Sequence, residues 1–254
     1  MTDYINIEEK GISKPIYRII SFERLVELFK FKQMAFVKPE KWDDPFENII
    51  AKTKINLGTA MAESFFESGI RNSSYGNCWT SKPVSDALWR IYSQDKKSVR
   101  IKSTPEILSR NIEKWLERHP NYRLYIGRVE YLKTIQIKAK AKAFAKSARS
   151  GDLCRAAAES LLFKREAFSH EDEVRVLMID QHNGGSDHLI KVDIDPHDII
   201  RTVVIDSRAS EEVVDMYSTY LIEKFKYRRS ISKSTLYDMP NPIIVKFKKK
   251  IKPR

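Results

Sequence analysis

The sequence predicts an α+β fold in a single domain spanning residues 1–254, and three observations support this prediction. The chain opens with a strand, a helix and a second strand. Further strands and helices then follow one another as far as residue 251. No internal repeat, low-complexity segment or linker divides the chain, so we expect one domain with a basic C-terminal end.

The opening elements follow from the spacing of apolar residues. Residues 16–20 read as a strand, and residues 34–37 read as a second, short strand. Residues 22–31 have helical spacing. The apolar side of this predicted helix consists of Phe22, Leu25, Val26, Leu28 and Phe29.

The segment from residue 42 to residue 47 contains a capping box that starts a further helix. Asp44 is the N-cap, Pro45 occupies the first helical position, and Glu47 lies three residues after the cap. Asp43 is not needed for the cap, so its carboxylate is available to a cleft.

The remaining elements continue the mixture of strands and helices. We expect strands at residues 75–81, 97–102, 122–131, 189–194, 202–206 and 243–251. We expect helices starting at Pro83, at Thr104 and at Ser210, and one or two more within the Ala-rich, basic residues 139–163. The sequence Gln181 to Asp187, with Gly184 and Gly185, predicts a turn.

The stretch from Ser169 to Met178 is the one that the rest of the chain is organised around. Read with a period of two, it is a strand whose apolar face carries Val174, Val176 and Met178. Its other face carries Glu171, Glu173 and Arg175. Neighbouring carboxylates repel unless a cation or a reacting group lies between them. The alternative is a solvated strand face with an internal ion pair.

Composition limits the class of protein. No run of eighteen apolar residues exists, and the first residues lack the pattern of a signal peptide, so we expect no membrane partner and a cytoplasmic location. Cys78 and Cys154 are the two cysteines, which favours a reducing compartment and excludes a Cys-rich zinc site.

The net charge of +12 favours a polyanionic partner such as nucleic acid. Six basic residues and no acidic one lie from Lys133 to Arg149. Eleven basic residues lie from Lys224 to Arg254, many of them from Lys246 onward, against Asp238 alone. These two stretches are the predicted nucleic-acid contacts. The alternative is a solubilising tail and a solvated helix face.

Several common catalytic motifs are absent from the sequence. There is no phosphate-binding loop, no G-x-G-x-x-G after a strand, no H-E-x-x-H and no G-x-S-x-G. The pattern of the zinc deaminases is absent too. The five histidines fall mostly in predicted turns, so we expect no metal site built on them.

Three separated segments resemble one large, mainly bacterial family, the domain of unknown function 2971 family. They are Ile16-Tyr17-Arg18 through Asp43-Asp44-Pro45-Phe46-Glu47, then Cys78-Trp79-Thr80-Ser81 with Trp89 and Tyr92, then Lys164 with Glu171-Asp172-Glu173-Val174-Arg175. The resemblance covers residues 16–206 and implies no activity. Asp43 and Trp79 depart from the family pattern, which has Asn and Phe there. The basic C-terminal end has no counterpart in the family.

A more distant resemblance is to the ADP-ribosyltransferases of the arginine-serine-glutamate class. Arg18 matches their first-strand arginine, Thr80 and Ser81 match their serine strand, and Glu171 with Glu173 matches their E-x-E motif. The resemblance implies a split β-sandwich with flanking helices that binds NAD without a Rossmann motif. The chain's β-α-β opening suits that fold.

This resemblance assigns roles to residues. Glu173 would stabilise the positive charge that develops on the ribose when the nicotinamide–ribose bond breaks. Glu171 would orient or deprotonate the acceptor nucleophile. Arg18 would hold the diphosphate of NAD. The residues expected to bind NAD are Tyr17, Arg18, Thr80, Ser81, Trp89 and Tyr92.

Each role has a structural alternative. The alternatives are pairing of Arg18 with Glu173 or Glu47, capping by Ser81 of the helix that follows, and pairing of Glu171 and Glu173 with Lys164 and Arg175. Core packing is the alternative for Trp89 and Tyr92.

Three functions therefore remain open. The first is an NAD-dependent ADP-ribosyltransferase that modifies a macromolecule, and the positive charge favours RNA or DNA as that macromolecule. Such an enzyme would act as a bacterial toxin or phage-defence effector, and an antitoxin or immunity protein would be a further partner. The second is a non-catalytic nucleic-acid-binding module. The third is a nuclease that holds magnesium through Asp43, Asp44, Glu47, Glu171 and Glu173. A cation at position 18 beside Glu173 would favour NAD over magnesium.

Overall fold

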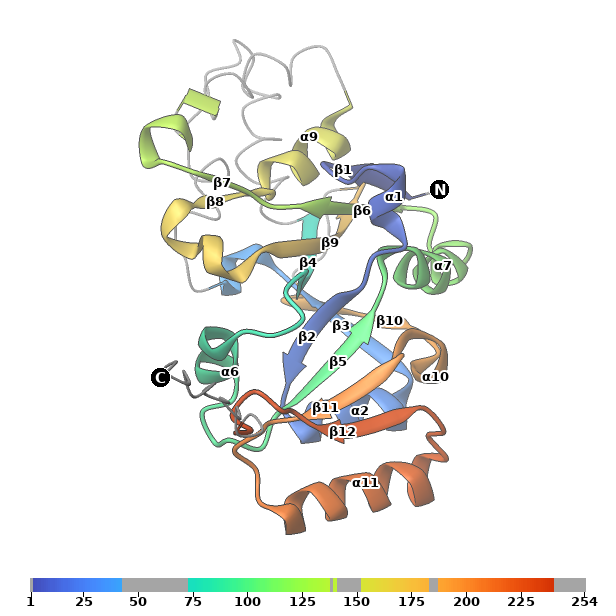
Figure 1. Ribbon diagram of the computed structural model, residues 1–254. Helices are drawn as coiled ribbons and strands as arrows, with labels where there is room; N and C mark the ends of the chain where they lie inside the picture. Colours follow the sequence, from blue (N-terminus) through green and yellow to red (C-terminus); the bar gives the residue numbers. More distant parts are fainter. Residues whose placement is uncertain (1, 43–72, 138, 141–151, 183–186, 240–254) are drawn as a thin grey trace, which may run out of the picture.

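The computed structural model describes residues 2–42, 73–137, 139–140, 152–182 and 187–239, and Figure 1 shows how their elements are arranged. The strands are β1 (Asp3–Ile5), β2 (Ile16–Ile20), β3 (Gln33–Val37), β4 (Ser74–Thr80), β5 (Val99–Ser103), β6 (Tyr122–Arg128), β7 (Glu130–Leu132), β8 (Phe163–Arg165), β9 (Glu173–Asp180), β10 (Leu189–Asp193), β11 (Thr202–Ile205) and β12 (Ser230–Lys233). The helices are α1 (Glu9–Ile12), α2 (Phe22–Phe31), α6 (Asp86–Tyr92), α7 (Pro105–Leu116), α9 (Leu153–Ser160), α10 (Pro196–Ile199) and α11 (Glu211–Phe225), with 3₁₀ turns η1 (Pro39–Lys41) and η4 (Glu166–Glu171). The architecture is mixed α/β, with a large sheet and helices around it.

In the described part of the chain, ten strands form one sheet. Eight of them follow the order β1-β6-β9-β4-β2-β5-β11-β12, while β3 pairs with β4 and β10 pairs with β3. Strand β9 runs antiparallel to both of its neighbours, β6 and β4. Its backbone is therefore hydrogen-bonded on both sides, which makes it a rigid place for functional side chains.

The sheet has little pairing between strands where β2 meets β4. These strands are in register at one residue pair, Tyr17 opposite Thr80. By contrast, β2 pairs with β5 along its whole length, and β4 pairs with β9 along its whole length. Figure 1 shows the two halves diverging from this junction, with β6 and β9 on one side and β5 and β11 on the other.

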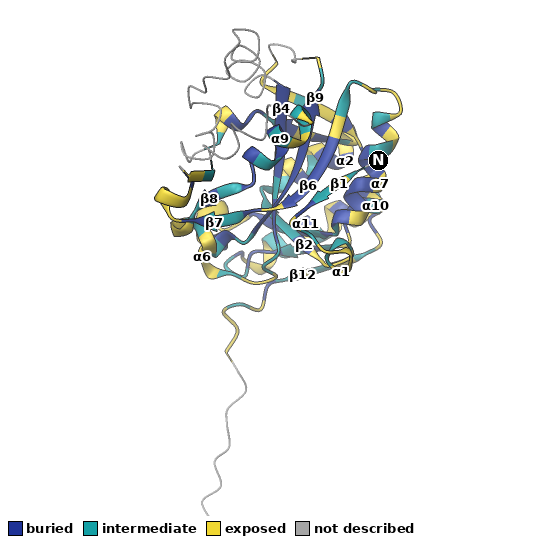
Figure 2. Ribbon diagram, turned by 90° about the horizontal axis from the view of Figure 1, so that it is seen from above, coloured by how far each residue is buried: buried dark blue, intermediate teal, exposed yellow. Residues whose placement is uncertain are grey.

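Both faces of β9 are buried, and they pack in different cores. Val174, Val176 and Met178 belong to the main hydrophobic cluster, as their alternation predicts. Leu177 and Ile179 pack on the opposite face, in a smaller cluster with residues of α9. Glu173 and Arg175 share this second face and are buried as well, as the dark blue of β9 in Figure 2 shows. The alternative of a solvated face is therefore wrong, although its ion pair within the strand, Arg175 with Glu173, is present.

The start of the central strand differs from the prediction. Residues 166–171 form η4, and β9 begins at Glu173. Asp172 between them has a left-handed backbone with φ of 44°, which Asp tolerates better than most residues. Glu171 and Glu173 therefore do not lie one pleat apart on a single strand.

Two other predicted elements need correction, and three fall outside the described residues. Residues 153–160 of the predicted helix 139–163 form α9, but Phe163–Arg165 form strand β8 beside β7. The predicted strand 122–131 divides at Val129 into β6 and β7. The capping box at Asp44, the glycine turn at 184–185 and the strand at 243–251 lie outside the described residues.

Periodicity predicted the elements between residues 16 and 37 correctly, but β1 and α1, which precede them, were not predicted. Strand β2 and helix α2 have the predicted bounds, and β3 begins one residue early. The hydroxyl of Ser21 accepts the backbone N–H of Arg24 and caps α2.

Candidate active site

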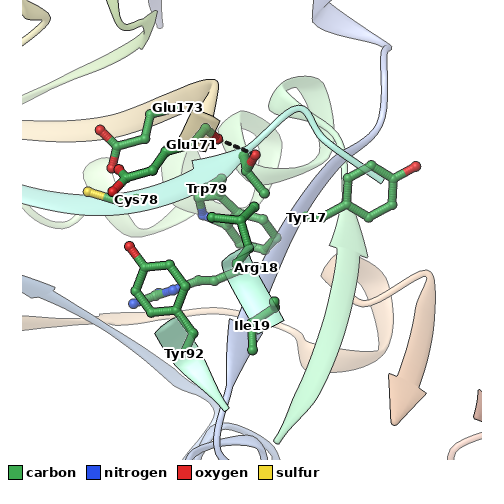
Figure 3. A pocket seen from close by; sticks show the side chains of 10 residues that line it. Tyr17, Arg18, Ile19, Cys78, Trp79, Tyr92, Glu171 and Glu173 are labelled. Carbon is green, nitrogen blue, oxygen red and sulfur yellow. Dashed lines mark hydrogen bonds between the residues drawn. The ribbon is translucent and has the colours of Figure 1, made fainter. Parts of the chain in front are cut away.

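A cavity of about 160 Å³ opens at the junction between β2 and β4 (Figure 3). It is lined by Tyr17, Arg18, Ile19, Cys78, Trp79, Thr80, Leu88, Tyr92, Glu171 and Glu173. A second cavity of about 350 Å³ shares Cys78, Tyr92, Glu171 and Glu173 with the first. The two carboxylates therefore stand at the wall that both cavities share. Together the cavities offer the space of a small-molecule site.

Arg18 enters the first cavity from the middle of β2. Its neighbours two residues away on the strand, Ile16 and Ile20, are apolar and pack in or against the main core. Among the described residues Arg18 has no hydrogen bond or ion pair, so the alternative of an ion pair with Glu173 is wrong. Burial lowers the pKa of its guanidinium, because the charged form loses solvation there. Within the described residues this cation lacks an anionic partner, and a ligand can supply one. Glu47, the other expected partner, lies outside the described residues.

Glu173 is fixed at the other side of the cavity. Its backbone N–H donates to the hydroxyl of Tyr131 at 2.8 Å, and its carbonyl accepts the N–H of Val129 at 3.0 Å. Its carboxylate oxygen Oε2 accepts hydrogen bonds from Arg175. The other oxygen, Oε1, accepts no hydrogen bond from any residue in the described ranges. Because the side chain lines both cavities, that oxygen is available to a ligand.

Glu171 reaches the same wall from the end of η4. Its carboxylate lies 2.5 Å from the ammonium of Lys164, and both side chains are buried. Lys164 also lies 3.6 Å from Oε2 of Glu173. Among the described residues, the charges of the two carboxylates and of the two cations Lys164 and Arg175 therefore balance, as the structural alternative for the motif predicts. Arg18 adds a positive charge beyond this balance.

Thr80 and Ser81 hold the loop that carries the carboxylates. The Thr80 hydroxyl donates to the carbonyl of Glu171 at 2.5 Å. The N–H and the hydroxyl of Ser81 both donate to the carbonyl of Asp172, at 2.9 and 3.1 Å. Thr80 lines the first cavity, whereas Ser81 lines a different cavity with Arg128. The end of β4 is thus tied to the loop between η4 and β9.

Ser81 does not cap the helix that follows, so that alternative is wrong. Helix α6 begins at Asp86, and the hydroxyl that accepts its N-terminal N–H belongs to Ser85. The predicted start at Pro83 is therefore three residues early.

The aromatic residues expected to bind NAD differ in their positions relative to the two cavities. Tyr92, at the end of α6, forms a wall of both cavities, and Figure 3 shows its hydroxyl turned toward Glu171 and Glu173. Burial first, and then these carboxylates, raise the pKa of the Tyr92 hydroxyl, so it remains a hydrogen-bond donor. Trp89 is buried in the fold and lines neither cavity. The ring of Tyr17 points away from the group in Figure 3, with the guanidinium of Arg100 5.0 Å from its centre.

Sequence reasoning missed several residues of the site. Cys78 and Trp79 line the first cavity, and Lys41, Trp42, Phe168 and His170 line the second. Lys164 and Arg175 were expected only as ion-pair partners. The signal for Lys164 was its place directly after Leu161-Leu162-Phe163, because a cation at the end of an apolar run needs a buried partner.

Most of the two basic stretches lies outside the described residues. Lys133 is described, and Lys140 forms an ion pair with Glu130 at the start of β7. Of the second stretch, residues 240–254 are not described. The predicted contacts with nucleic acid from Lys133 to Arg149 and from Lys246 to Arg254 therefore stay predictions.

Within the described ranges, no three His, Cys, Asp or Glu side chains are placed to hold a metal ion. Asp43, Asp44 and Glu47 fall outside those ranges. No helix in the described part of the chain is long and apolar enough to cross a membrane.

Comparisons with known proteins give one family and a set of solved structures. A family model described as "Protein of unknown function (DUF2971)" matches residues 88–176, which confirms the resemblance to that family. No curated protein matches significantly. Thermus sp. 2.9 DarT in complex with NAD+ is 9% identical, with a TM-score of 0.35 over 90% of this chain and 98% of that chain. The same protein in complex with ADP-ribosylated ssDNA is 11% identical, with a TM-score of 0.36 over 90% and 95%.

Proposed function

We propose that this chain is an NAD-dependent ADP-ribosyltransferase that breaks the nicotinamide–ribose bond and transfers ADP-ribose to a macromolecule. One observation carries the proposal. The cavity at the β2–β4 junction holds a fixed carboxylate, Glu173, together with a cation, Arg18, that has no partner among the described residues. A substrate that joins a reacting sugar to a diphosphate needs both.

Glu173 has the geometry for stabilising the transition state. As the bond to nicotinamide breaks, positive charge develops on the ribose. A carboxylate held in place beside the sugar stabilises that charge at no cost in reorganisation. The oxygen Oε1 would accept a hydrogen bond from a ribose hydroxyl, while Oε2 stays with Arg175.

Arg18 suits the diphosphate of NAD. Guanidinium groups bind phosphate oxygens in a planar, bidentate geometry. Among the described residues that line the first cavity, Arg18, Glu171 and Glu173 are the charged ones, and the two carboxylates already have cationic partners. A phosphate is therefore attracted by Arg18 without strong repulsion from the carboxylates.

Glu171 and Tyr92 complete the proposed reaction centre. Glu171 lies at the wall shared by both cavities, where an acceptor nucleophile in the second cavity would meet the ribose. Its carboxylate would orient that nucleophile or take its proton. Tyr92 offers a ring face for stacking and a protonated hydroxyl for a hydrogen bond.

The shape of the sheet is consistent with this assignment. The single pair of residues that joins β2 to β4 divides the sheet into two halves. We interpret this division as the split β-sandwich expected from the sequence, with the NAD site at its opening.

The magnesium nuclease is the weaker reading of the same residues. Glu171 and Glu173 both lie within ion-pair distance of Lys164, and Glu173 is also bound by Arg175. These cations would repel a divalent metal ion at the carboxylates. Arg18 in the same cavity adds to that repulsion.

Nucleic acid is the proposed acceptor, because the chain carries a net charge of +12. Tyr237 donates a hydrogen bond to Asp86, the first residue of α6, which carries Tyr92 at its other end. Tyr237 therefore lies beside α6, the helix that contributes Tyr92 to the cavity wall. In the sequence, Tyr237 comes shortly before the basic residues from Lys246 to Arg254. An effector of this kind would act as a toxin or in phage defence, with a neutralising protein as partner.

The test is an assay of both halves of the reaction. Purified protein is incubated with NAD labelled in its adenylate part, together with RNA, single-stranded DNA or protein. We expect release of nicotinamide and transfer of the label to nucleic acid. Label on protein would keep the enzyme class but change the acceptor, and no release of nicotinamide with any acceptor would contradict the proposed function.

A further inference from the structure

We infer that Arg175 is a positioning residue, which orients the carboxylate of Glu173 so that one oxygen faces the substrate. The inference rests on the proposed function, since it explains how that catalytic carboxylate is held. Thr80 and Ser81, which were expected to bind NAD, do not contact this carboxylate in the hydrogen bonds of the described residues. Thr80 and Ser81 instead bind backbone carbonyls of the loop.

The hydrogen bonds from Arg175 to Glu173 both fall on one oxygen of that carboxylate. Nε donates to Oε2 at 3.1 Å, and Nη2 donates to the same Oε2 at 2.5 Å. The ammonium of Lys164 is also nearest to Oε2, at 3.6 Å. A carboxylate held through a single oxygen cannot exchange its two oxygens by rotation without losing these contacts. Oε1 is therefore kept toward the cavity.

Arg175 is itself immobilised. Its side chain is fully buried, and Nη1 donates to the carbonyl of Leu161 at 2.6 Å. The guanidinium lies 4.3 Å from the centre of a Trp42 ring. A hydrogen bond, an ion pair and a ring contact thus fix the plane of the guanidinium and, through it, the plane of the carboxylate.

Gly76 explains how Trp42 reaches this position. One face of β4 carries every second residue, namely Gly76, Cys78 and Thr80. This face lies beside Glu173 and Arg175 on β9. A Cβ atom at position 76 would lie 2.5 Å from the ring of Trp42. The missing side chain therefore lets Trp42 lie against the sheet and cover Arg175.

Each of the two carboxylates has its own main cation. Lys164 lies 2.5 Å from Glu171, whereas Arg175 binds Glu173. This division keeps the two acids in separate orientations although they share one wall. A lysine at position 175 would keep the charge but would lose the planar group that fixes Oε2.

The experiment compares Arg175→Lys with the wild-type protein in steady-state cleavage of NAD. We expect the kcat for nicotinamide release to fall about 100-fold, because small misplacements of a reacting group have effects of that order. The KM for NAD should change less than about threefold, since Arg18 still binds the diphosphate. Arg110→Lys is the matched control, because Arg110 contacts both oxygens of Asp198 on the remote helices α7 and α10.

A second variant covers the case in which Arg175→Lys does not fold. Trp42→Leu removes the ring over the guanidinium at a half-buried position, and we expect a loss in kcat of about tenfold. Folded variants whose kcat stays within twofold of wild type would overturn the inference.

Failure of the proposed function gives a different result, because the wild-type protein would then cleave no NAD. In that case crystal structures of the wild-type protein and Arg175→Lys provide the readout. A single orientation of Glu173 in the wild-type protein and a changed one in the variant would support the positioning role. The same orientation of Glu173 in both would contradict it.

Discussion

The hydroxyl of Thr80 donates a 2.5 Å hydrogen bond to the carbonyl oxygen of Glu171, and this bond joins the end of β4 to the loop before β9. Thr80 is also the residue opposite Glu173 in the sheet. One side chain therefore sets the position of the loop from which both acidic side chains reach the cavity.

Replacement of Thr80 by Val should loosen that loop. The variant leaves the buried carbonyl of Glu171 without this donor, so we expect the free energy of unfolding to fall by about 1–3 kcal/mol. The kcat for cleavage of NAD should fall severalfold. Urea unfolding and steady-state kinetics measure the two effects, with the exposed Thr219→Val as control. Unchanged values of both would show that the bond does not hold the loop.

Replacement of Arg18 by Met should weaken the binding of NAD without lowering the free energy of unfolding. Arg18 has no partner among the described residues, so an apolar side chain of similar length should keep or raise the free energy of unfolding. The same change should weaken the binding of NAD at least tenfold. Calorimetric titration checks this, with the exposed Arg24→Met as control. A large loss of stability without weaker NAD binding would show that Arg18 has a structural role only.

The sequence was sufficient for some local elements and for locating the central stretch, but it did not predict β1, α1, β8, α10 or β12. Apolar spacing predicted β2, α2 and the buried face of β9 correctly, because these patterns depend on neighbours in the chain. It could not predict that Asp172 takes a left-handed conformation. That conformation is supported by bonds from Ser81 and by an ion pair with Arg128, both distant in sequence.

The burial of the second face of β9 could not be predicted from the sequence either. An alternating strand with Glu173 and Arg175 on one side is typical of a solvated face, but α9 and Trp42 cover that side and make it an interior. The positioning role of Arg175 depends on this cover. The roles of Arg18, Glu171 and Glu173 as reacting or binding groups stay predictions that kinetics must test.

Acid sensitivity should depend on Asp206, whose side chain is fully buried. Burial alone would raise the pKa of this carboxyl, but hydrogen bonds from Arg208 and Ser93 outweigh it and hold the pKa below its usual value. A lowered pKa in the folded state means that the stabilisation is complete above about pH 4. It is lost as the pH falls through the folded-state pKa.

Asp206→Asn should therefore lower the free energy of unfolding at pH 7 by about 2 kcal/mol. It should also make that free energy depend less steeply on pH below about pH 4. Urea unfolding between pH 3 and pH 7 measures both quantities. An identical slope in variant and wild type would exclude Asp206 as a source of acid sensitivity.

The basic C-terminal stretch should contribute to the binding of nucleic acid. Replacing Lys248, Lys249 and Lys250 by Ser should weaken the binding of single-stranded RNA or DNA. It should also reduce the salt slope by about two, because each lost phosphate contact removes about 0.7. Titrations at two salt concentrations measure this, with Lys10, Lys30 and Lys97 replaced together as the control. Equal affinities and slopes would point to a protein acceptor.

The most direct test of the central claim is the rate at which Glu173→Gln releases nicotinamide from NAD. Gln keeps the shape and can still accept a hydrogen bond from Arg175, but it lacks the charge needed beside the reacting ribose. We expect a folded variant whose kcat is lower by about 100-fold or more, while Glu159→Gln on the exposed face of α9 stays within twofold of wild type. Release of nicotinamide by Glu173→Gln at the wild-type rate would contradict the account.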